Sequence, residues 1–216
     1  MKVLLINGSP NEKRCTYTAL AEVAKSLHAE GIETEIAWIG TDPVRGCDGC
    51  AGCTKRGDQR CIHHDDVINH LLDLAEKADG IVVGTPVFYA GANGALIAVL
   101  DRMFRAGSAV MAHKPGASIA SARRAGTTCA IDQLNKYFLF NNMPLVSSNY
   151  WPMVHGQSVE QVKRDEEGLQ IMRILGQNMA WLLQCVEAGK TAGINTPLLE
   201  RKIATNFIDP LKNSID

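Results

Sequence analysis

The sequence predicts a doubly wound α/β fold, in which one five-stranded parallel sheet carries helices on both faces. Short apolar runs alternate along the chain with stretches of helical periodicity, as parallel strands and their crossover helices require. The 216 residues, 46% of them hydrophobic, are enough for one sizeable core. No linker or low-complexity stretch divides them. We therefore expect one domain over residues 1–190, followed by a tail over residues 191–216.

The strands are predicted from their apolar pattern and from the turn residues around them. Residues 3–6 form a short apolar run that ends in Asn7-Gly8-Ser9-Pro10, which is typical of a buried parallel strand. Residues 33–39 alternate polar and apolar side chains, as expected near a sheet edge with one wetter face. The five expected strands cover residues 3–6, 33–39, 80–84, 114–120 and 143–147.

The stretches between these strands have the apolar spacing of helices. In the first of them, Leu20, Val23, Ala24 and Leu27 fall on one helix face, and Gly31 follows its end. The expected helices cover residues 17–30, 65–78, 94–106, 128–142 and 157–188. Because strand and helix alternate, the simplest topology is a flavodoxin-like sheet with strand order 2-1-3-4-5.

The loop after the first strand is a candidate anion site. In a parallel sheet, such a loop directs its N–H groups and the positive end of the next helix at one point. Ser9 and Thr16 can add hydroxyl donors, and Thr16 or Thr18 can also cap the helix. The alternative is an ordinary turn of small polar residues. Neither G-x-x-x-x-G-K-[ST] nor G-x-G-x-x-G is present, which favours a mononucleotide over a nucleoside triphosphate or a dinucleotide.

The loops after the third and fourth strands should reach the same ligand in this topology. The first of these loops contains the rigid Pro86, the adjacent aromatic residues Phe88 and Tyr89, and small residues that let a planar ring approach the backbone. The second contains Arg123 and Arg124, whose guanidinium groups can donate hydrogen bonds or stack on a flat ring. The alternative is that neither loop binds a ligand: the two aromatic side chains then fold into the core, and the two arginines are solvated.

On these loops the chain resembles the NADPH-dependent FMN reductases and their close kin, the iron-sulfur flavoproteins. Gly8-Ser9-Pro10 with Thr16 is similar to the phosphate loop of that family, and residues 85–89 look like the loop that lies against the isoalloxazine ring. The resemblance spans roughly residues 2–150. One departure is that the family often has Arg and Asn where this chain has Asn11 and Cys15.

The resemblance implies bound FMN and a set of contacts for each of its parts. Around the phosphate and the ribityl chain it implies Ser9, Asn11, Cys15, Thr16 and Tyr17. Along the ring it implies Pro86, Val87, Phe88, Tyr89 and Asn93, with Ser121, Arg124 and Gly126 closing the site from the third loop.

Four of the seven cysteines lie on one loop, residues 46–64, in the pattern Cys47-x2-Cys50-x2-Cys53-x7-Cys61. Thiolates this close can surround one soft metal centre, and the glycines between them let the backbone fold around it. The resemblance implies a [4Fe-4S] cluster here. A structural zinc site and a metal-free thiol loop are the alternatives.

Two further groups of residues are expected to have structural roles. His63-His64-Asp65-Asp66 is interpreted as a helix start, with His64 or Asp65 as the cap and Asp66 in the first turn, where negative charge suits the helix dipole. Cys129 and Cys185 lie in helical patterns and are expected to be buried apolar residues.

The resemblance implies an FMN-dependent oxidoreductase that takes electrons from NAD(P)H and passes them to a quinone, a flavin or another small acceptor. No acid or base side chain is obligatory, and Arg124 is a candidate to stabilise negative charge on the reduced ring. One alternative is an FMN/iron-sulfur electron-transfer protein that serves protein partners. Another is a thiol-based sensor without flavin.

Charge and hydropathy narrow the expected partners. The 22 basic and 23 acidic residues nearly cancel, and no dense Lys/Arg block is present to follow a nucleic acid or an anionic membrane. No apolar stretch approaches the roughly 20 residues that span a bilayer. We therefore expect a small-molecule partner, no nucleic acid or membrane, and a cytoplasmic location in which thiols stay reduced. Relatives of this fold often pair, which implies a homodimer or a homotetramer.

Overall fold

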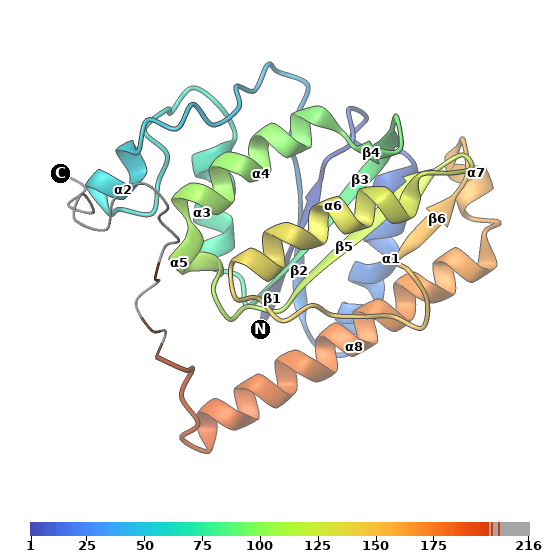
Figure 1. Cartoon of the computed structure of the whole chain (residues 1–216). Coiled ribbons are helices and arrows are strands. Elements are labelled where there is room, and N and C mark those ends of the chain that lie inside the picture. The colour runs from blue at the N-terminus through green and yellow to red at the C-terminus, as the bar shows by residue number, and fades with distance from the viewer. Residues whose placement is uncertain (199, 201–202, 204–216) are drawn as a thin grey trace.

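A parallel sheet forms the centre of the protein in the computed structural model, which describes residues 1–198, 200 and 203 (Figure 1). Its main strands lie in the order β2-β1-β3-β5-β6, and each adjacent pair is parallel. Numbered without the short β4, this is the predicted order 2-1-3-4-5, so the predicted fold class is confirmed. The strands are β1 (Lys2–Asn7), β2 (Glu33–Trp38), β3 (Gly80–Phe88), β5 (Gly116–Ala122) and β6 (Met153–His155).

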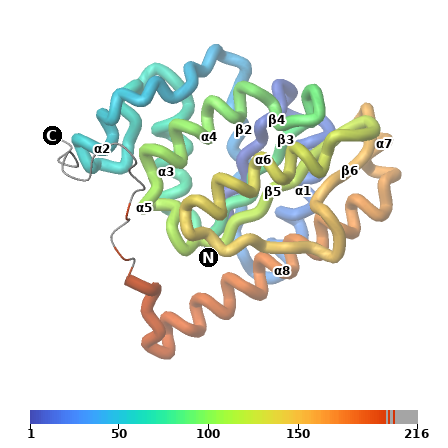
Figure 2. Tube along the Cα trace, viewed as in Figure 1, coloured from blue at the N-terminus to red at the C-terminus, as the bar shows by residue number. Residues whose placement is uncertain are grey.

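Helices cover both faces of the sheet (Figures 1 and 2). Val3 and Leu5 of β1 point to the face covered by α1 (Cys15–Ala29) and α8 (Glu166–Thr191). Leu4 and Ile6 point to the opposite face, which is covered by α3 (Ile68–Glu76), α4 (Gly94–Ala106), α5 (Ser108–Met111) and α6 (Thr127–Phe140). Both faces are therefore buried, which explains why β1 is apolar without alternation.

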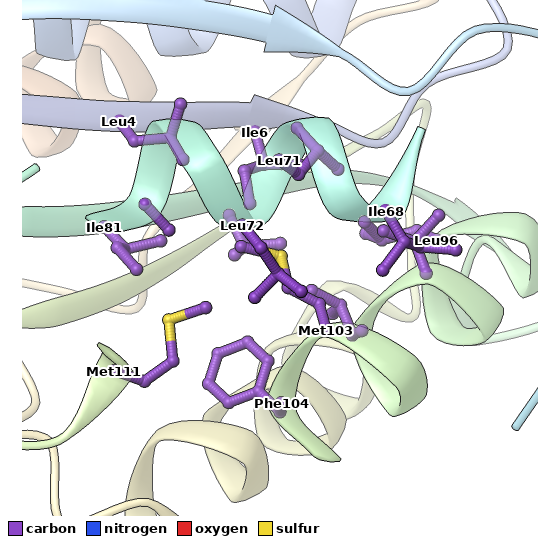
Figure 3. Close-up of a cluster of buried hydrophobic side chains, with 14 of the residues drawn as sticks. Leu4, Ile6, Ile68, Leu71, Leu72, Ile81, Leu96, Met103, Phe104 and Met111 are labelled. Atoms are coloured by element: carbon purple, nitrogen blue, oxygen red, sulfur yellow. The ribbon is translucent and has the colours of Figure 1, made fainter. Parts of the chain in front are cut away.

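The core beneath the second face consists of closely packed aliphatic and aromatic side chains. Figure 3 shows Leu4 and Ile81 of the sheet facing Leu72 of α3, with Met103 and Phe104 of α4 beyond them. This packing fixes α4 against the sheet. The position of α4 matters for function because the helix extends from one candidate site to the other.

The strand register brings three loops to one edge of the sheet. Asn7 of β1 pairs with Gly84 of β3, and Pro86 of β3 pairs with Ser121 of β5. The loops that follow these strands therefore begin at similar heights, at the carboxyl edge where ligands bind in open α/β sheets.

The predicted fifth strand at residues 143–147 is wrong. Within that range Leu145 makes only an isolated bridge to Gly116, and the fifth strand is β6, which pairs with residues 120–122. Pro144 lacks an N–H group and Leu145 is exposed, so this segment cannot form a full ladder.

The predicted helix at residues 157–188 is two helices, α7 (Val159–Val162) and α8. Asp165 separates them, because its carboxylate caps α8 by accepting a hydrogen bond from Gly168 N at 3.0 Å and also accepts one from His155 N at 2.6 Å. Three short elements were not predicted: α2 (Gly52–Arg56), β4 (Gly91–Ala92) and α5.

The end of the chain is described only in part. Helix α8 extends to Thr191, and most of the predicted tail at 191–216 lies outside the described residues. Among the described helices, none has both the length and the apolar character that crossing a bilayer requires.

Candidate functional site

The loop between β1 and α1 leaves the positive end of a helix without a side-chain acceptor. The cap residue of α1 is Arg14, no side chain caps the helix, and its first turn has no acidic residue. The predicted capping by Thr16 or Thr18 is wrong, since Thr16 lies inside the helix and the Thr18 hydroxyl donates to Arg14 O at 3.0 Å. The first N–H groups of α1 therefore remain available to an anion.

Buried hydroxyl groups lie beside this helix end. Thr16 Oγ1 of α1 is 2.8 Å from Ser121 Oγ at the end of β5, although the two residues are 105 positions apart. Ser9 is also buried, and its hydroxyl accepts a hydrogen bond from Asn11 N at 3.1 Å. Trp38 of β2 holds the same loop by donating from its indole N–H to Ser9 O at 2.7 Å. Hydroxyls and free N–H groups are the donors that a phosphate monoester needs.

The loop after β3 is a tight hairpin. Residues 87–88 pair antiparallel with residues 91–92 of β4. The two residues between them, Tyr89 and Ala90, have φ values of +49° and +61°. Two successive left-handed residues make the turn that best suits a two-residue hairpin, although this conformation is unfavourable for residues with a Cβ.

The hairpin presents its aromatic residues to solvent. Phe88 is 45% exposed and Tyr89 is fully exposed. The alternative in which both aromatic side chains fold into the core is therefore wrong. Pro86 and Val87 are half-buried at the base of the hairpin.

Asn93 joins the first loop to the second. Its side chain caps α4 by accepting from Ala95 N at 3.3 Å, and its amide N–H₂ donates to Gly8 O at 2.7 Å. Its backbone N–H donates to Thr85 Oγ1 at 3.0 Å. The predicted ring residue Asn93 is thus already bound to both loops and fixes their separation.

Gly126 brings the third loop against the hairpin. It has φ +89°, and a Cβ at this position would lie 2.7 Å from Ala90 Cα and 2.9 Å from Val87 Cγ1. Only glycine allows this approach. Arg123 and Arg124 precede it and are exposed, as is Asn11 in the first loop, while Cys15 and Tyr17 are half-buried near the start of α1.

The cysteine loop forms a separate centre. Cys47, Cys50, Cys53 and Cys61 all line one small hollow, together with Arg102 of α4. Gly49, Ala51 and Gly57 have positive φ values, which let this segment turn around the hollow. The arrangement fits a thiolate-bound metal centre because all four cysteine residues border the same space.

Arg102 is a buried residue of the cysteine hollow that the sequence pattern did not indicate. It is only 2% exposed, and its Nε and Nη2 atoms both donate to Cys61 Sγ at 3.3 Å. It also forms an ion pair with Asp66 and donates to the carbonyls of Arg45 and His63. Burial alone would lower the pKa of Arg102, but its hydrogen bonds to Asp66 and Cys61 outweigh burial and raise it.

This ion pair corrects the predicted helix start. Helix α3 begins at Ile68 with Val67 as its cap, so neither His64 nor Asp65 caps it. Asp66 pairs with Arg102 and accepts from Ile68 N at 3.2 Å. The sequence did contain one indication of this ion pair. Arg102 lies three positions after Val99, on the apolar face of the predicted helix, where a charged side chain needs a partner.

Polar residues around the cysteines fix the rest of the loop. Asn69 binds Cys61 at both backbone groups, accepting from its N–H at 2.9 Å and donating to its carbonyl at 3.0 Å. Asp48 accepts from Cys50 N at 3.2 Å and is 3.0 Å from His63 Nε2. The hydrogen bond from the Cys50 thiol, followed by those from Cys50 N and from His63, lowers the pKa of Asp48 to about 2. Cys129 and Cys185 are exposed, so their predicted burial is wrong.

The sheet and all three loops fall inside one family match. Residues 1–158 match the model of the NADPH-dependent FMN reductases. The chain belongs to this family. The resemblance inferred from the three loops is thereby confirmed, and membership places the chain among flavin-dependent oxidoreductases.

Similar proteins from several organisms are named iron-sulfur flavoproteins. An iron-sulfur flavoprotein of Methanocaldococcus jannaschii is 31% identical over 196 residues, which cover 87% of this chain and all of the relative. An iron-sulfur flavoprotein of Archaeoglobus fulgidus is 34% identical over 160 residues, which cover 72% of this chain and 77% of the relative. Among solved structures, a flavodoxin from the domain Archaea superposes with a TM-score of 0.59 at 15% identity, covering 85% of this chain and 99% of that one. That similarity shows the flavodoxin-like fold.

Proposed function

We propose that this protein is an FMN-dependent oxidoreductase that passes electrons from NAD(P)H through bound FMN to a quinone, a free flavin or another small acceptor. One observation supports this most: the buried hydroxyls of Thr16 and Ser121 meet beside the uncapped start of α1. Two further loops stand at the same edge of the sheet, one hydrogen-bonded to the first loop and the other packed against the second.

The residues fit the two ends of FMN. In this proposal Ser9, Thr16 and the first N–H groups of α1 bind the phosphate, with Asn11, Cys15, Tyr17 and Ser121 around the ribityl chain. Residues 86–89 border the ring, and Asn93 and Gly126 keep the three loops at a fixed separation. When bound, FMN supplies the redox chemistry, because its ring accepts hydride from NAD(P)H and returns electrons to an acceptor.

The protein contributes orientation and charge. The exposed guanidinium of Arg124 stabilises negative charge on the ring, and the exposed rings of Phe88 and Tyr89 offer a stacking surface to a planar second substrate. We propose that the protein acts in the cytoplasm as a homodimer or homotetramer, in which a neighbouring loop covers the flavin.

The test compares two threonine variants of one helix. Thr16→Val removes a hydroxyl from the proposed phosphate site and should weaken FMN binding about tenfold or more, because a hydrogen bond to a charged group contributes roughly 1.5–3 kcal/mol. Thr18→Val, whose hydroxyl bonds only Arg14 O, should bind FMN as the unmodified protein does. Flavin fluorescence quenching measures both affinities. Equal affinity for the two variants would contradict the proposed phosphate site.

Turnover tests the reaction separately. The FMN-loaded protein should oxidise NADH or NADPH steadily once a quinone is added. Protein that holds FMN but is reduced only by a ferredoxin-like partner would instead support the electron-transfer alternative.

The four-cysteine hollow favours that second candidate, an FMN/iron-sulfur electron-transfer protein. Four cysteine residues border one space, and the guanidinium of Arg102 can stabilise negative charge on the sulfur of Cys61. When bound there, a [4Fe-4S] cluster exchanges single electrons. Anaerobic purification should then give about four iron and four sulfide per chain and a broad, air-sensitive absorption shoulder beyond the flavin bands. Iron-free protein after anaerobic reconstitution would exclude this candidate.

A further inference from the structure

Asp48, Cys50 and His63 form a second group of potential metal ligands on the cysteine loop. One carboxylate oxygen, the sulfur and one imidazole nitrogen all lie within 4.8 Å of one another. Only Cys50 belongs to the four-cysteine pattern. The other two residues introduce oxygen and nitrogen ligands that an iron-sulfur cluster does not need.

Contacts within the loop hold the three groups in place. The two oxygens of Asp48 are used separately, one accepting from Cys50 N at 3.2 Å and the other lying 3.0 Å from His63 Nε2. The carbonyl of His63 accepts hydrogen bonds from Arg102 Nη2 at 3.3 Å and from Asn69 Nδ2 at 3.2 Å. Since Arg102 is buried and paired with Asp66, the backbone at His63 is anchored to the core.

The chemistry of this set suits zinc. Zn²⁺ accepts thiolate, imidazole and carboxylate ligands at roughly 2.0–2.3 Å, so ligand atoms around a tetrahedral ion lie about 3–4 Å apart. The three groups are close to that spacing before any ion enters. One carboxylate and one thiolate balance the charge of the ion, and the thiol proton leaves to solvent on binding.

We propose that Asp48, Cys50 and His63 form a mononuclear zinc site with a water molecule in the fourth position. This site and the four-cysteine centre exclude each other because both require Cys50. Zinc therefore prevents the loop from taking up iron and sulfide. The zinc site is independent of FMN binding, so its failure would leave the proposed flavin chemistry intact.

The experiment uses the full chain, purified without oxygen and stripped of metal with a chelator. Zn²⁺ is titrated in competition with a chromophoric chelator, and Co²⁺ then reports the ligand geometry by its absorption spectrum. The unmodified protein should bind one ion per chain. His63→Gln and Asp48→Asn should each weaken zinc binding at least tenfold, whereas His64→Gln, the adjacent histidine, should not change it.

Two cysteine variants separate the two centres. Cys50→Ser should lose both zinc binding and iron-sulfur reconstitution, while Cys47→Ser should lose reconstitution alone, and both residues are exposed, so neither change disturbs packing. Circular dichroism of each metal-free variant checks that it folds. Full zinc affinity in His63→Gln, loss of zinc in Cys47→Ser, or weak binding without a fixed stoichiometry, as for an adventitious ion only, would each overturn the proposal.

Discussion

At the scale of single residues, Arg102 is the side chain that connects the core to the cysteine loop. Arginine is almost never fully buried unless it is paired, because removing its charge from water is costly. Here the cost is offset by Asp66, by Cys61 Sγ and by two backbone carbonyls. The fold of the loop therefore depends on one cation inside helix α4.

We predict that Asp66→Asn destabilises the metal-free protein by about 3–5 kcal/mol, because it leaves the Arg102 charge buried without a counter-charge. Arg105→Met, on the exposed side of the same helix, should change the free energy of unfolding by only about 0.5 kcal/mol. Urea unfolding followed by circular dichroism measures both. Similar midpoints for the two variants would show that the ion pair contributes little.

At the scale of elements, the three loops owe their arrangement to a few close backbone approaches. Gly126 sits against the hairpin where no Cβ fits, and Asn93 connects the hairpin to Gly8. The loops behave as one unit because each is bonded to or packed on another.

We predict that Gly126→Ala lowers both stability and FMN affinity, since its positive φ and its 2.7 Å approach to Ala90 Cα both oppose a side chain. The cost should be about 1–3 kcal/mol. Gly94→Ala is the matched control, because a Cβ at this position would meet no atom within 4 Å and Gly94 opens helix α4. This control should be neutral or slightly stabilising. Thermal unfolding with and without FMN distinguishes the two, and an unaffected Gly126→Ala would contradict the close approach.

The sequence predicted the sheet order and the position of all three loops, because apolar runs and helical spacing are local signals. It did not predict the hairpin, since Tyr89-Ala90 lacks the Gly or Asn that normally indicates such a turn. It also did not predict the ion pair between Asp66 and Arg102, because these two residues are 36 positions apart in the sequence. The fifth strand was misplaced because residues 143–147 and 153–155 are both short and apolar, and only pairing with β5 decides between them.

At the scale of the whole molecule, the helices on one face are joined by polar contacts as well as by the core. Tyr137 of α6 donates to Asp101 of α4 at 2.5 Å. Burial and this carboxylate raise the pKa of Tyr137 above its usual value of 10.0. The folded protein thus holds the phenol proton more tightly than the unfolded chain does.

Linkage then gives a pH dependence for global stability. Because the folded pKa is raised, the contribution of Tyr137 is fully present below pH 10 and is lost as the pH rises toward the folded value. The gap in unfolding temperature between the unmodified protein and Tyr137→Phe should therefore stay constant up to about pH 10 and shrink as the pH rises above that value, as measured by calorimetry. Tyr150→Phe, at an exposed position, serves as the control. A gap that stays constant with pH would contradict the assignment.

Helix α4 is capped by Asn93, which joins the first two loops, and carries Arg102, which fixes the cysteine loop. Between Ala95 and Ala106 it contains neither glycine nor proline. The number of residues between Asn93 and Arg102 therefore determines the direction in which the Arg102 side chain leaves the helix relative to Asn93. Inserting one residue in its middle would rotate Arg102 by about 100° around the axis and turn it away from Cys61, while leaving Asn93 in place.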